Sequence, residues 1–187
     1  SNTGFVLLAA MIEKAARDKF VNVMADYLKK QKLVHATFNP RYLNAEAAYG
    51  RVFKNSKYHF WNPSHYSSMY AAPYTGAWIS MAELASFGQL LLKASDEVSH
   101  PLHLMAMRHK KHIGYGLGIV HQYRFGHSTL EHDGCSSGFL CRLIVVPEKE
   151  MVITIATNGG GETAATKDFR LITDNILITA LSLEKFD

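Results

Sequence analysis

Residues 140–157 read LCRLIVVPEKEMVITIAT, and this stretch decides the fold class of the chain. Two apolar runs rich in β-branched residues, Leu140–Val146 and Met151–Thr157, lie on either side of the polar turn Pro147–Glu150. Such runs, joined by a short turn, predict an antiparallel β-hairpin. Because both runs are apolar on both faces, we expect other elements to cover the hairpin on each side.

The segments that flank this hairpin differ in character. Downstream, the glycine-rich run Asn158–Gly161 ends the strand pattern, and apolar residues at helical spacing from Phe169 to Leu183 predict a C-terminal helix. Upstream, the run Ile113–Tyr123 is strand-like and contains three glycines. The change from helical to β character is therefore expected near residues 100–113.

The beginning of the chain is predicted to be helical. Apolar residues at helical spacing predict a first helix over residues 3–17, capped by one of the three residues that open the chain. A second helix follows, with Asp18 as its cap and lysines near its C-terminus. Ser80-Met-Ala-Glu83 has the spacing of a capping box and predicts that another helix begins there.

Residues 34–75 show no clear periodicity and are predicted to form a long irregular stretch. A loop of this length is usually functional or covers a site. Its aromatic residues favour either ordinary packing or the lining of a binding groove. They are Tyr42, Tyr49, Phe53, Tyr58, Phe60, Trp61, Tyr66, Tyr70 and Tyr74.

Composition excludes several classes of protein. The 187 residues are 48% hydrophobic and 19% charged, which is typical of a globular chain and not of a disordered or collagen-like polymer. The net charge of +4 is mild, and the basic run Arg108–His112 is interpreted as a solvated helix end or loop, so no nucleic-acid partner is expected. Cys135 and Cys141 are too few for a disulfide framework and lack metal-ligand spacing, and no cofactor or metal is expected.

The sequence contains no signal for crossing a membrane. No stretch approaches the roughly 20 apolar residues of a membrane span. The apolar run Phe5–Ile12 follows no basic residue and precedes the acidic Glu13, so it is not interpreted as a signal peptide. The sequence begins with Ser1-Asn2-Thr3, without methionine or a leader, and enters a helix at once, as we expect of a segment from within a longer polypeptide.

Three kinds of short motif match catalytic or metal-binding patterns, but their surroundings argue against them. Gly134-Cys-Ser136-Ser-Gly138 fits the G-x-S-x-G nucleophile elbow, yet a strand is predicted to follow it and no Val/Ile-rich strand is evident before it. Ser182-Leu-Glu-Lys185 fits S-x-x-K but lies at the last helical turn, which frays. Two histidine pairs lack the further ligands of a zinc site. They are His100 with His103 and His109 with His112.

Six segments occur in an order that is known from one protein family. They are Ser1–Glu13, Gly76–Phe87, Tyr115–Gly118, His132–Gly134 with Gly138 and Phe139, Pro147–Lys149, and Val152–Gly159. The first resembles the segment that follows the tyrosine of a Tyr-x-Asn motif, and the fourth occupies the place of a Lys-Thr-Gly or His-x-Gly motif. Together they resemble the serine β-lactamase-related hydrolases, which include class C β-lactamases, DD-peptidases and related esterases.

The resemblance implies a fold class and an approximate division of the chain. The implied class is α+β, of the β-lactamase/transpeptidase type, with an antiparallel sheet packed by helices and part of a helical subdomain. Residues 1–112 would form the partial helical subdomain with the long loop, and residues 113–187 the sheet strands and the C-terminal helix. Many members of the family are exported, so a periplasmic or exported location is suggested by the family alone.

The resemblance also implies an activity and four site residues. The substrate would be an amide or ester, namely a β-lactam, a D-amino-acid peptide or a simple ester, hydrolysed through an acyl-enzyme. Asn2 would be the amide of the second motif, and His132 the polar side chain of the third motif that faces the substrate. Gly134 would be the glycine of that motif, and the backbone N–H of Cys135 one donor of the oxyanion hole. A histidine in place of lysine favours an esterase or peptidase over a dedicated β-lactamase.

The same resemblance identifies parts that this sequence lacks. The family's S-x-x-K nucleophile motif lies upstream of Tyr-x-Asn, and the tyrosine would immediately precede Ser1. The chain alone is therefore expected to be nearly inactive. The alternative is a non-catalytic fragment or binding module that self-associates through an uncovered sheet edge, with another copy or the missing N-terminal half as its partner.

Overall fold

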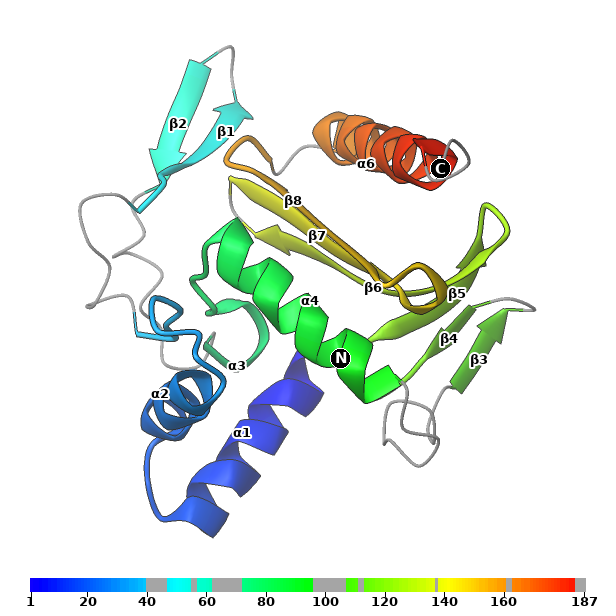
Figure 1. The fold of residues 1–187 in the computed structure, drawn as a ribbon. Coiled ribbons are helices and arrows are strands. Elements are labelled where there is room, and N and C mark those ends of the chain that lie inside the picture. Colours follow the sequence, from blue (N-terminus) through cyan, green and yellow to red (C-terminus); the bar gives the residue numbers. More distant parts are fainter. Residues whose placement is uncertain are drawn as a thin grey trace.

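The computed structural model describes residues 1–39, 47–54, 57–61, 72–95, 107–110, 113–136, 138–160 and 163–183. In these ranges a six-stranded antiparallel sheet lies between two helices, α4 (Met81–Ser95) on one face and α6 (Thr163–Leu183) on the other (Figure 1). The predicted α+β class with a helix-packed antiparallel sheet is confirmed.

The sheet is a meander in which each strand pairs with its neighbours along the chain. The predicted hairpin forms its last two strands, with Leu140 opposite Thr157 and Val146 opposite Met151 across a short 3₁₀ turn. The strands are β3 (Met107–Lys110), β4 (Ile113–Tyr115), β5 (Val120–Arg124), β6 (His127–Ser136), β7 (Phe139–Val146) and β8 (Met151–Thr157).

Both faces of this hairpin are covered, as its sequence predicts. On the α4 face, Leu143 and Val145 are buried against a stripe of apolar residues on the helix. Gly88 of α4 allows this approach, because a Cβ there would lie 2.4 Å from a methyl carbon of Val152. On the α6 face, Ile144 and Val146 pack against two leucines of α6, Leu177 and Leu181. Each buried aliphatic side chain contributes about 1.5–3 kcal/mol.

The first two helices are confirmed, but one of their predicted caps is wrong. Helix α1 (Asn2–Ala16) begins after Ser1, whose Oγ accepts a hydrogen bond from the backbone N–H of Gly4. Helix α2 (Phe20–Lys30) has Lys19 as its N-cap, without a side-chain hydrogen bond. Asp18 lies one residue earlier and accepts hydrogen bonds from Asn22 Nδ2 and the backbone N–H of Lys19, which together hold its pKa below the ordinary value.

The predicted capping box of α4 is half formed. Ser80 Oγ accepts a hydrogen bond from the N–H of Glu83 at 3.2 Å, as the pattern predicts. Glu83 does not reach back to Ser80. Its Oε1 instead accepts from the backbone N–H of His35 at 2.8 Å and so joins the segment after α2 to the start of α4.

Four strand assignments from the sequence were incomplete. Part of residues 34–75 is regular, because β1 (Gly50–Lys54) and β2 (Lys57–Trp61) form a separate hairpin; a short helix, α3 (Ala72–Thr75), follows. The run Ile113–Tyr123 is two strands, β4 and β5, because Gly118, with φ of +87°, turns the chain between them. Strand β3 occupies part of the basic run interpreted as a helix end or loop. Strand β6 leads into the G-x-S-x-G motif and ends at Ser136 within it, where no Val/Ile-rich strand was evident from the sequence.

The division at residue 112 stays a prediction. Within the described residues, no helix combines the length and apolar character needed to span a membrane.

Candidate functional site

The second half of β6 is paired on one side only. Strand β5 pairs with β6 over His127–Glu131, whereas β7 pairs with it over Leu130–Ser136. Among the described residues, therefore, residues 132–136 have a partner strand on the β7 side and none on the other. We call residues 132–136 the β6 edge. An edge of this kind presents unpaired backbone N–H and C=O groups to any extended ligand.

His132 is exposed on the β6 edge and contacts an aromatic residue of β4. Its Nε2 lies 3.2 Å from the Oη of Tyr115, and the two rings meet edge to face. Either group donates, depending on the imidazole tautomer. A phenol and an imidazole that share a hydrogen bond can pass a proton between them, which is the chemistry of a general acid or base. The sequence predicts no role for Tyr115, which belongs to the segment Tyr115–Gly118 of the family resemblance.

Gly134 is required by packing inside the sheet. A Cβ at this position would lie 2.4 Å from the Sγ of Cys141, its partner on β7. Burial, followed by the charge of Asp133, raises the pKa of the Cys141 thiol, so it stays protonated and is a poor nucleophile. Cys135 is exposed and lies opposite Leu140, so the two free cysteines point to opposite faces of the sheet.

The G-x-S-x-G motif forms a turn between two strands. Ser136 is the last residue of β6, and Gly138 has φ of +79° just before β7 begins; Ser137 lies outside the described residues. A nucleophile elbow needs a helix after the turn, and here a strand follows. A Cβ at Gly138 would lie 2.6 Å from the backbone nitrogen of Arg51, so this turn is packed against the β1–β2 hairpin.

The other motifs are placed away from the β6 edge or lie outside the described residues. Ser182 donates its Oγ hydrogen to the carbonyl of Ile178 in the last turn of α6, and Lys185 is not among the described residues. His109 lies on β3, of which only the backbone is described, and the other three paired histidines are outside the described ranges. Within these ranges no group of three or more His, Cys, Asp or Glu is arranged to hold a metal ion.

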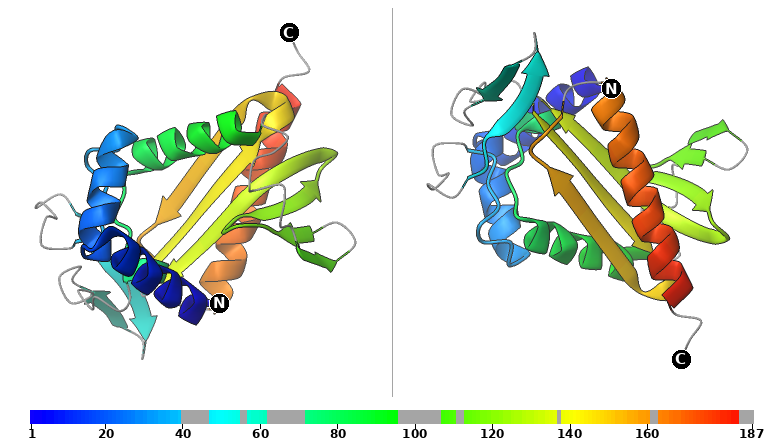
Figure 2. Two further views of the ribbon diagram at one scale, coloured as in Figure 1. Left: turned by 90° about the horizontal axis from the view of Figure 1, so that it is seen from below. Right: turned by 90° about the horizontal axis from the view of Figure 1, so that it is seen from above.

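Asn2 is exposed in the first turn of α1. Helix α1 lies on the side of the sheet opposite α6 (Figure 2). One turn later, the ring of Phe5 lies 3.8 Å from the position of a Cβ on Gly118, so the start of α1 is next to the β4–β5 turn. Among the hydrogen bonds of the described residues, none joins Asn2 to His132. The structure thus brings His132, Gly134 and Cys135 together on one strand and leaves Asn2 on a separate element.

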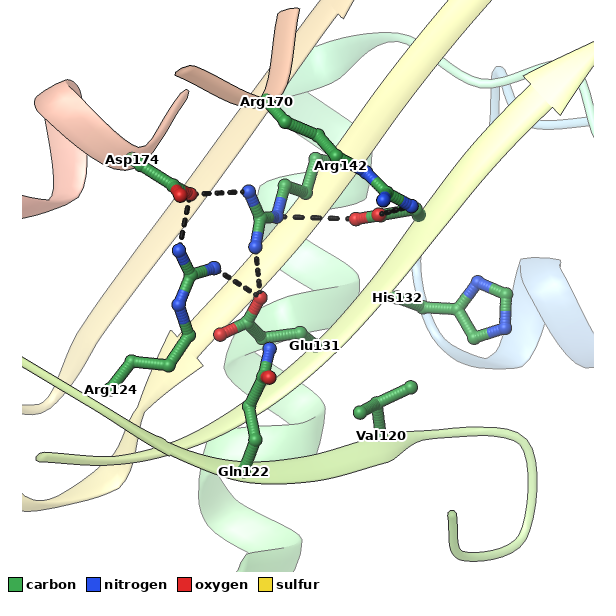
Figure 3. A pocket seen from close by; sticks show the side chains of 9 residues that line it. Val120, Gln122, Arg124, Glu131, His132, Arg142, Arg170 and Asp174 are labelled. Carbon is green, nitrogen blue, oxygen red and sulfur yellow. Dashed lines mark hydrogen bonds and ion pairs between the residues drawn. The ribbon is translucent and has the colours of Figure 1, made fainter. Parts of the chain in front are cut away.

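Four charged residues form a closed ring on the α6 face, immediately beside the β6 edge (Figure 3). Glu131 Oε2 accepts hydrogen bonds from Arg142 Nη2 at 2.5 Å and from Arg124 Nη1 at 3.2 Å. Asp174 of α6 pairs with the same two arginines, with Arg142 Nη1 at 2.7 Å. We call these four residues the ionic ring.

The ionic ring is buried at Glu131 and Arg142 and half-buried at Arg124 and Asp174, and its charges are mutually stabilised. Glu131 is only 2% exposed and Arg142 only 5%. Burial disfavours the charged form of Arg142, but the charge and hydrogen bond of Glu131 outweigh it and raise the pKa of the guanidinium. Burial likewise opposes ionisation of Asp174, yet its hydrogen bonds from Arg124 and Arg142 hold its pKa below the ordinary value.

A branch of this network reaches the β6 edge itself. Asp133, between His132 and Gly134, pairs with Arg142 Nε at 3.2 Å and with Arg170 Nη2 of α6 at 3.0 Å. Figure 3 shows the His132 side chain pointing away from the ring. Asp133 is joined to the ring by its ion pair with Arg142. A cavity of about 470 Å³ opens beside these residues. The sequence alone did not predict this network. Its one sign in the sequence is Arg142, a charged residue inside the apolar run Leu140–Val146.

Comparison with known proteins identifies the fold. A sequence profile of the family described as Beta-lactamase matches residues 1–175. Similar solved structures include a D-stereospecific amidohydrolase from Streptomyces sp. (20% identity, TM-score 0.69), covering 84% of this chain and 49% of that one. No curated protein sequence matches the chain.

Two further structures agree in fold. An octameric penicillin-binding protein homologue from Pyrococcus abyssi is 19% identical with a TM-score of 0.70, and covers 86% of this chain and 38% of that one. A beta-lactamase/D-alanine carboxypeptidase from Yersinia pestis is 17% identical with a TM-score of 0.64, and covers 87% and 50%. The chain therefore spans half or less of each of these three structures, and the predicted β-lactamase/transpeptidase-like fold is confirmed.

Proposed function

The chain belongs to the beta-lactamase family, and from this we propose that it forms the substrate-facing sheet edge of a hydrolase that cleaves an amide or ester through an acyl-enzyme. The observation that carries the proposal is the one-sided pairing of the β6 edge, on which His132, Gly134 and Cys135 lie. An extended substrate would bind there as an added strand.

Each residue of the edge has a proposed role. The backbone N–H of Cys135 would donate to the oxyanion that develops on the substrate carbonyl. His132, with Tyr115 as its hydrogen-bond partner, would face the substrate and transfer or position a proton. Asn2 would contribute its amide from the start of α1. Asp133 would hold the segment in place through Arg142 and Arg170.

The nucleophile and its base would come from outside this sequence. Acyl transfer requires an activated hydroxyl close to the oxyanion donors. The S-x-x-K serine of this chain, Ser182, is on the last turn of α6, on the opposite side of the sheet from α4. We propose that an S-x-x-K segment of a longer natural polypeptide approaches the β6 edge.

The similar structures support D-amino-acid amides or peptides as the first substrates to test. One is described as a D-stereospecific amidohydrolase and another as a beta-lactamase/D-alanine carboxypeptidase. A histidine at position 132 is compatible with this class and with simple esters. Binding is tested by adding a peptide that ends in D-alanyl-D-alanine and recording amide NMR shifts at residues 132–136. Shifts confined to regions remote from the β6 edge would contradict the proposed site.

Turnover is tested with nitrocefin and a p-nitrophenyl ester on the chain and on the complete natural polypeptide. We expect almost no turnover by the chain, and turnover by the complete polypeptide that falls about 100-fold in His132→Ala. Strong turnover by the chain that Ser136→Ala abolishes would instead assign the nucleophile to Ser136 and overturn the proposal.

The second candidate is a binding module that associates with itself, and the one-sided pairing of β6 is the observation that favours it. An exposed apolar stripe on α1 adds to this, with Leu7 and Met11 61% and 66% exposed. One similar structure is described as octameric. Light scattering over a concentration series, together with the turnover assay, distinguishes the hydrolase from the binding module. A binding module would be oligomeric, and every polypeptide that contains it would be inactive.

A further inference from the structure

The β1–β2 hairpin carries three exposed aromatic rings on one face. The register pairs Arg51 with Phe60 and Phe53 with Tyr58, and paired residues share a face of an antiparallel ladder. These four side chains therefore project to the same side, which we call the aromatic face. Phe53 is 44% exposed, Tyr58 63% and Phe60 67%. Such a cluster of exposed rings is a mark of an interaction surface.

The hairpin is fixed to the end of the main sheet. The backbone N–H of Arg51 donates to the carbonyl of Asn158 at 2.7 Å, and the N–H of Gly160 donates back to the carbonyl of Arg51 at 3.2 Å. Gly138 leaves room for this contact. Figures 1 and 2 show the hairpin standing out at the periphery of the molecule. The aromatic face is thus held on a supported projection.

The charge of this region indicates what kind of partner fits it. The sequence has no Asp or Glu from residue 47 to residue 82, although the whole chain has sixteen. The hairpin itself contains Arg51, Lys54 and Lys57. On the aromatic face, the guanidinium of Arg51 lies 5.9 Å from the centroid of the Tyr58 ring. The surface is therefore both aromatic and basic, which complements a partner that is both apolar and anionic.

Ring geometry favours a fluid partner over a rigid one. The Phe53 and Tyr58 rings lie 5.0 Å apart and are tilted by 60°, so they do not form a flat platform on which a sugar ring stacks. The interface of a bilayer accepts aromatic rings at any tilt and places cations beside lipid phosphates. We propose that the aromatic face docks this protein on the surface of an anionic lipid bilayer. Docking of this kind is peripheral and needs no spanning helix.

The test measures co-sedimentation of the chain with vesicles of phosphatidylcholine alone and of an equimolar phosphatidylglycerol/phosphatidylcholine mixture. We expect binding to the anionic vesicles that decreases as salt is added. The double variant Phe53→Ser, Phe60→Ser is expected to lower the partition coefficient by about tenfold or more. Arg51→Gln should lower it about fivefold on anionic vesicles only. The hydrogen bonds of Arg51 to Asn158 and Gly160 are made by its backbone, so this variant keeps the hairpin attached to the main sheet.

Phe125→Ser is the matched control. Phe125 is 48% exposed and has the guanidinium of Arg124 5.2 Å from its ring centroid, but it lies in the β5–β6 turn. The partition coefficient of the Phe125→Ser variant on anionic vesicles should equal that of the parent chain. Equal binding by the parent and the double variant, or an equal loss in Phe125→Ser, would overturn the proposal. If the chain self-associates in a concentration-dependent way and the double variant abolishes this, the aromatic face would be assigned to a second copy instead. Circular dichroism checks that every variant is folded.

Discussion

The two faces of the central sheet are stabilised by different interactions. The α4 face is mainly aliphatic, with Leu143 and Val145 buried against the helix. The α6 face joins an aliphatic patch around Leu177 to the ionic ring at the end nearer the β6 edge. Aliphatic packing tolerates partial loss, whereas a buried ion pair stabilises only when each partner is present. The sheet is therefore more sensitive to single changes on the α6 face than on the α4 face, toward which the His132 side chain projects.

We expect the largest loss of stability from a substitution that breaks the ionic ring. Arg142→Ala leaves Glu131 buried without its main partner, and the free energy of unfolding should fall by about 3–5 kcal/mol. Urea denaturation followed by circular dichroism measures the change. The double variant Glu131→Leu, Arg142→Met removes both charges and should recover most of the loss. A double variant as unstable as the single one would show that the charges themselves are not the cause.

The corresponding change on the aliphatic face is Leu143→Ala. Leu143 is 5% exposed, and its truncation leaves a cavity against α4 that should cost about 2–5 kcal/mol. The loss should not depend on pH, in contrast to changes in the ionic ring. Leu117→Ala is the control, because Leu117 is 50% exposed and its truncation should change stability by less than about 0.5 kcal/mol. Equal losses in both variants would contradict the burial argument.

A third change tests the close contact between β6 and β7. Gly134→Ala places a methyl group against the sulfur of Cys141 and should cost about 1–3 kcal/mol. Adding Cys141→Ala removes the obstructing sulfur and should restore part of the stability. Thermal unfolding of the single and double variants measures this. If the second substitution brings no recovery, the role of Gly134 is not one of packing against Cys141.

The smallest expected effect is the pH dependence of the ionic ring. The pKa of Asp174 is held below its ordinary value of 3.8, so its ionised form stabilises the folded state above about pH 4. This contribution is lost as the pH falls through the folded-state pKa. Asp174→Asn should therefore cost about 1 kcal/mol at neutral pH, with a smaller difference from the parent in acid. A difference that is constant from pH 7 to pH 3 would contradict the argument.

The apolar parts of the fold could be predicted from the sequence because they have strong periodicity. The hairpin of β7 and β8 and the helices α1, α2 and α6 follow from runs of apolar residues. Strand β6 could not, because His127–Ser136 has few apolar residues: polar groups occupy its α6 face, where they enter the ionic ring. The β1–β2 hairpin could not be predicted because its aromatic rings are exposed, so its apolar residues do not alternate between a buried and an exposed face.

The candidate site was predictable only as a string of residues. His132, Gly134 and Cys135 are neighbours in sequence, and their placement on a strand with one free side depends on where β5 begins, at Val120, which pairs with Glu131. Tyr115 reaches His132 from 17 residues away, and Arg170 reaches Asp133 of β6 from helix α6. Contacts between elements of this kind carry no local sequence signal. The roles proposed for these residues, and for Asn2, stay predictions.

The meander order of the sheet has a consequence for how the chain folds. Strands β3 to β7 each pair with the next strand along the chain, so the sheet can assemble as successive hairpins with short loops to close. Helix α6 docks through Asp174 on Arg124 of β5 and Arg142 of β7, so both strands must already be paired with β6. We therefore expect α6 to dock late and to open first. In native-state hydrogen exchange, its amides should exchange before those of β7, which is covered on both faces.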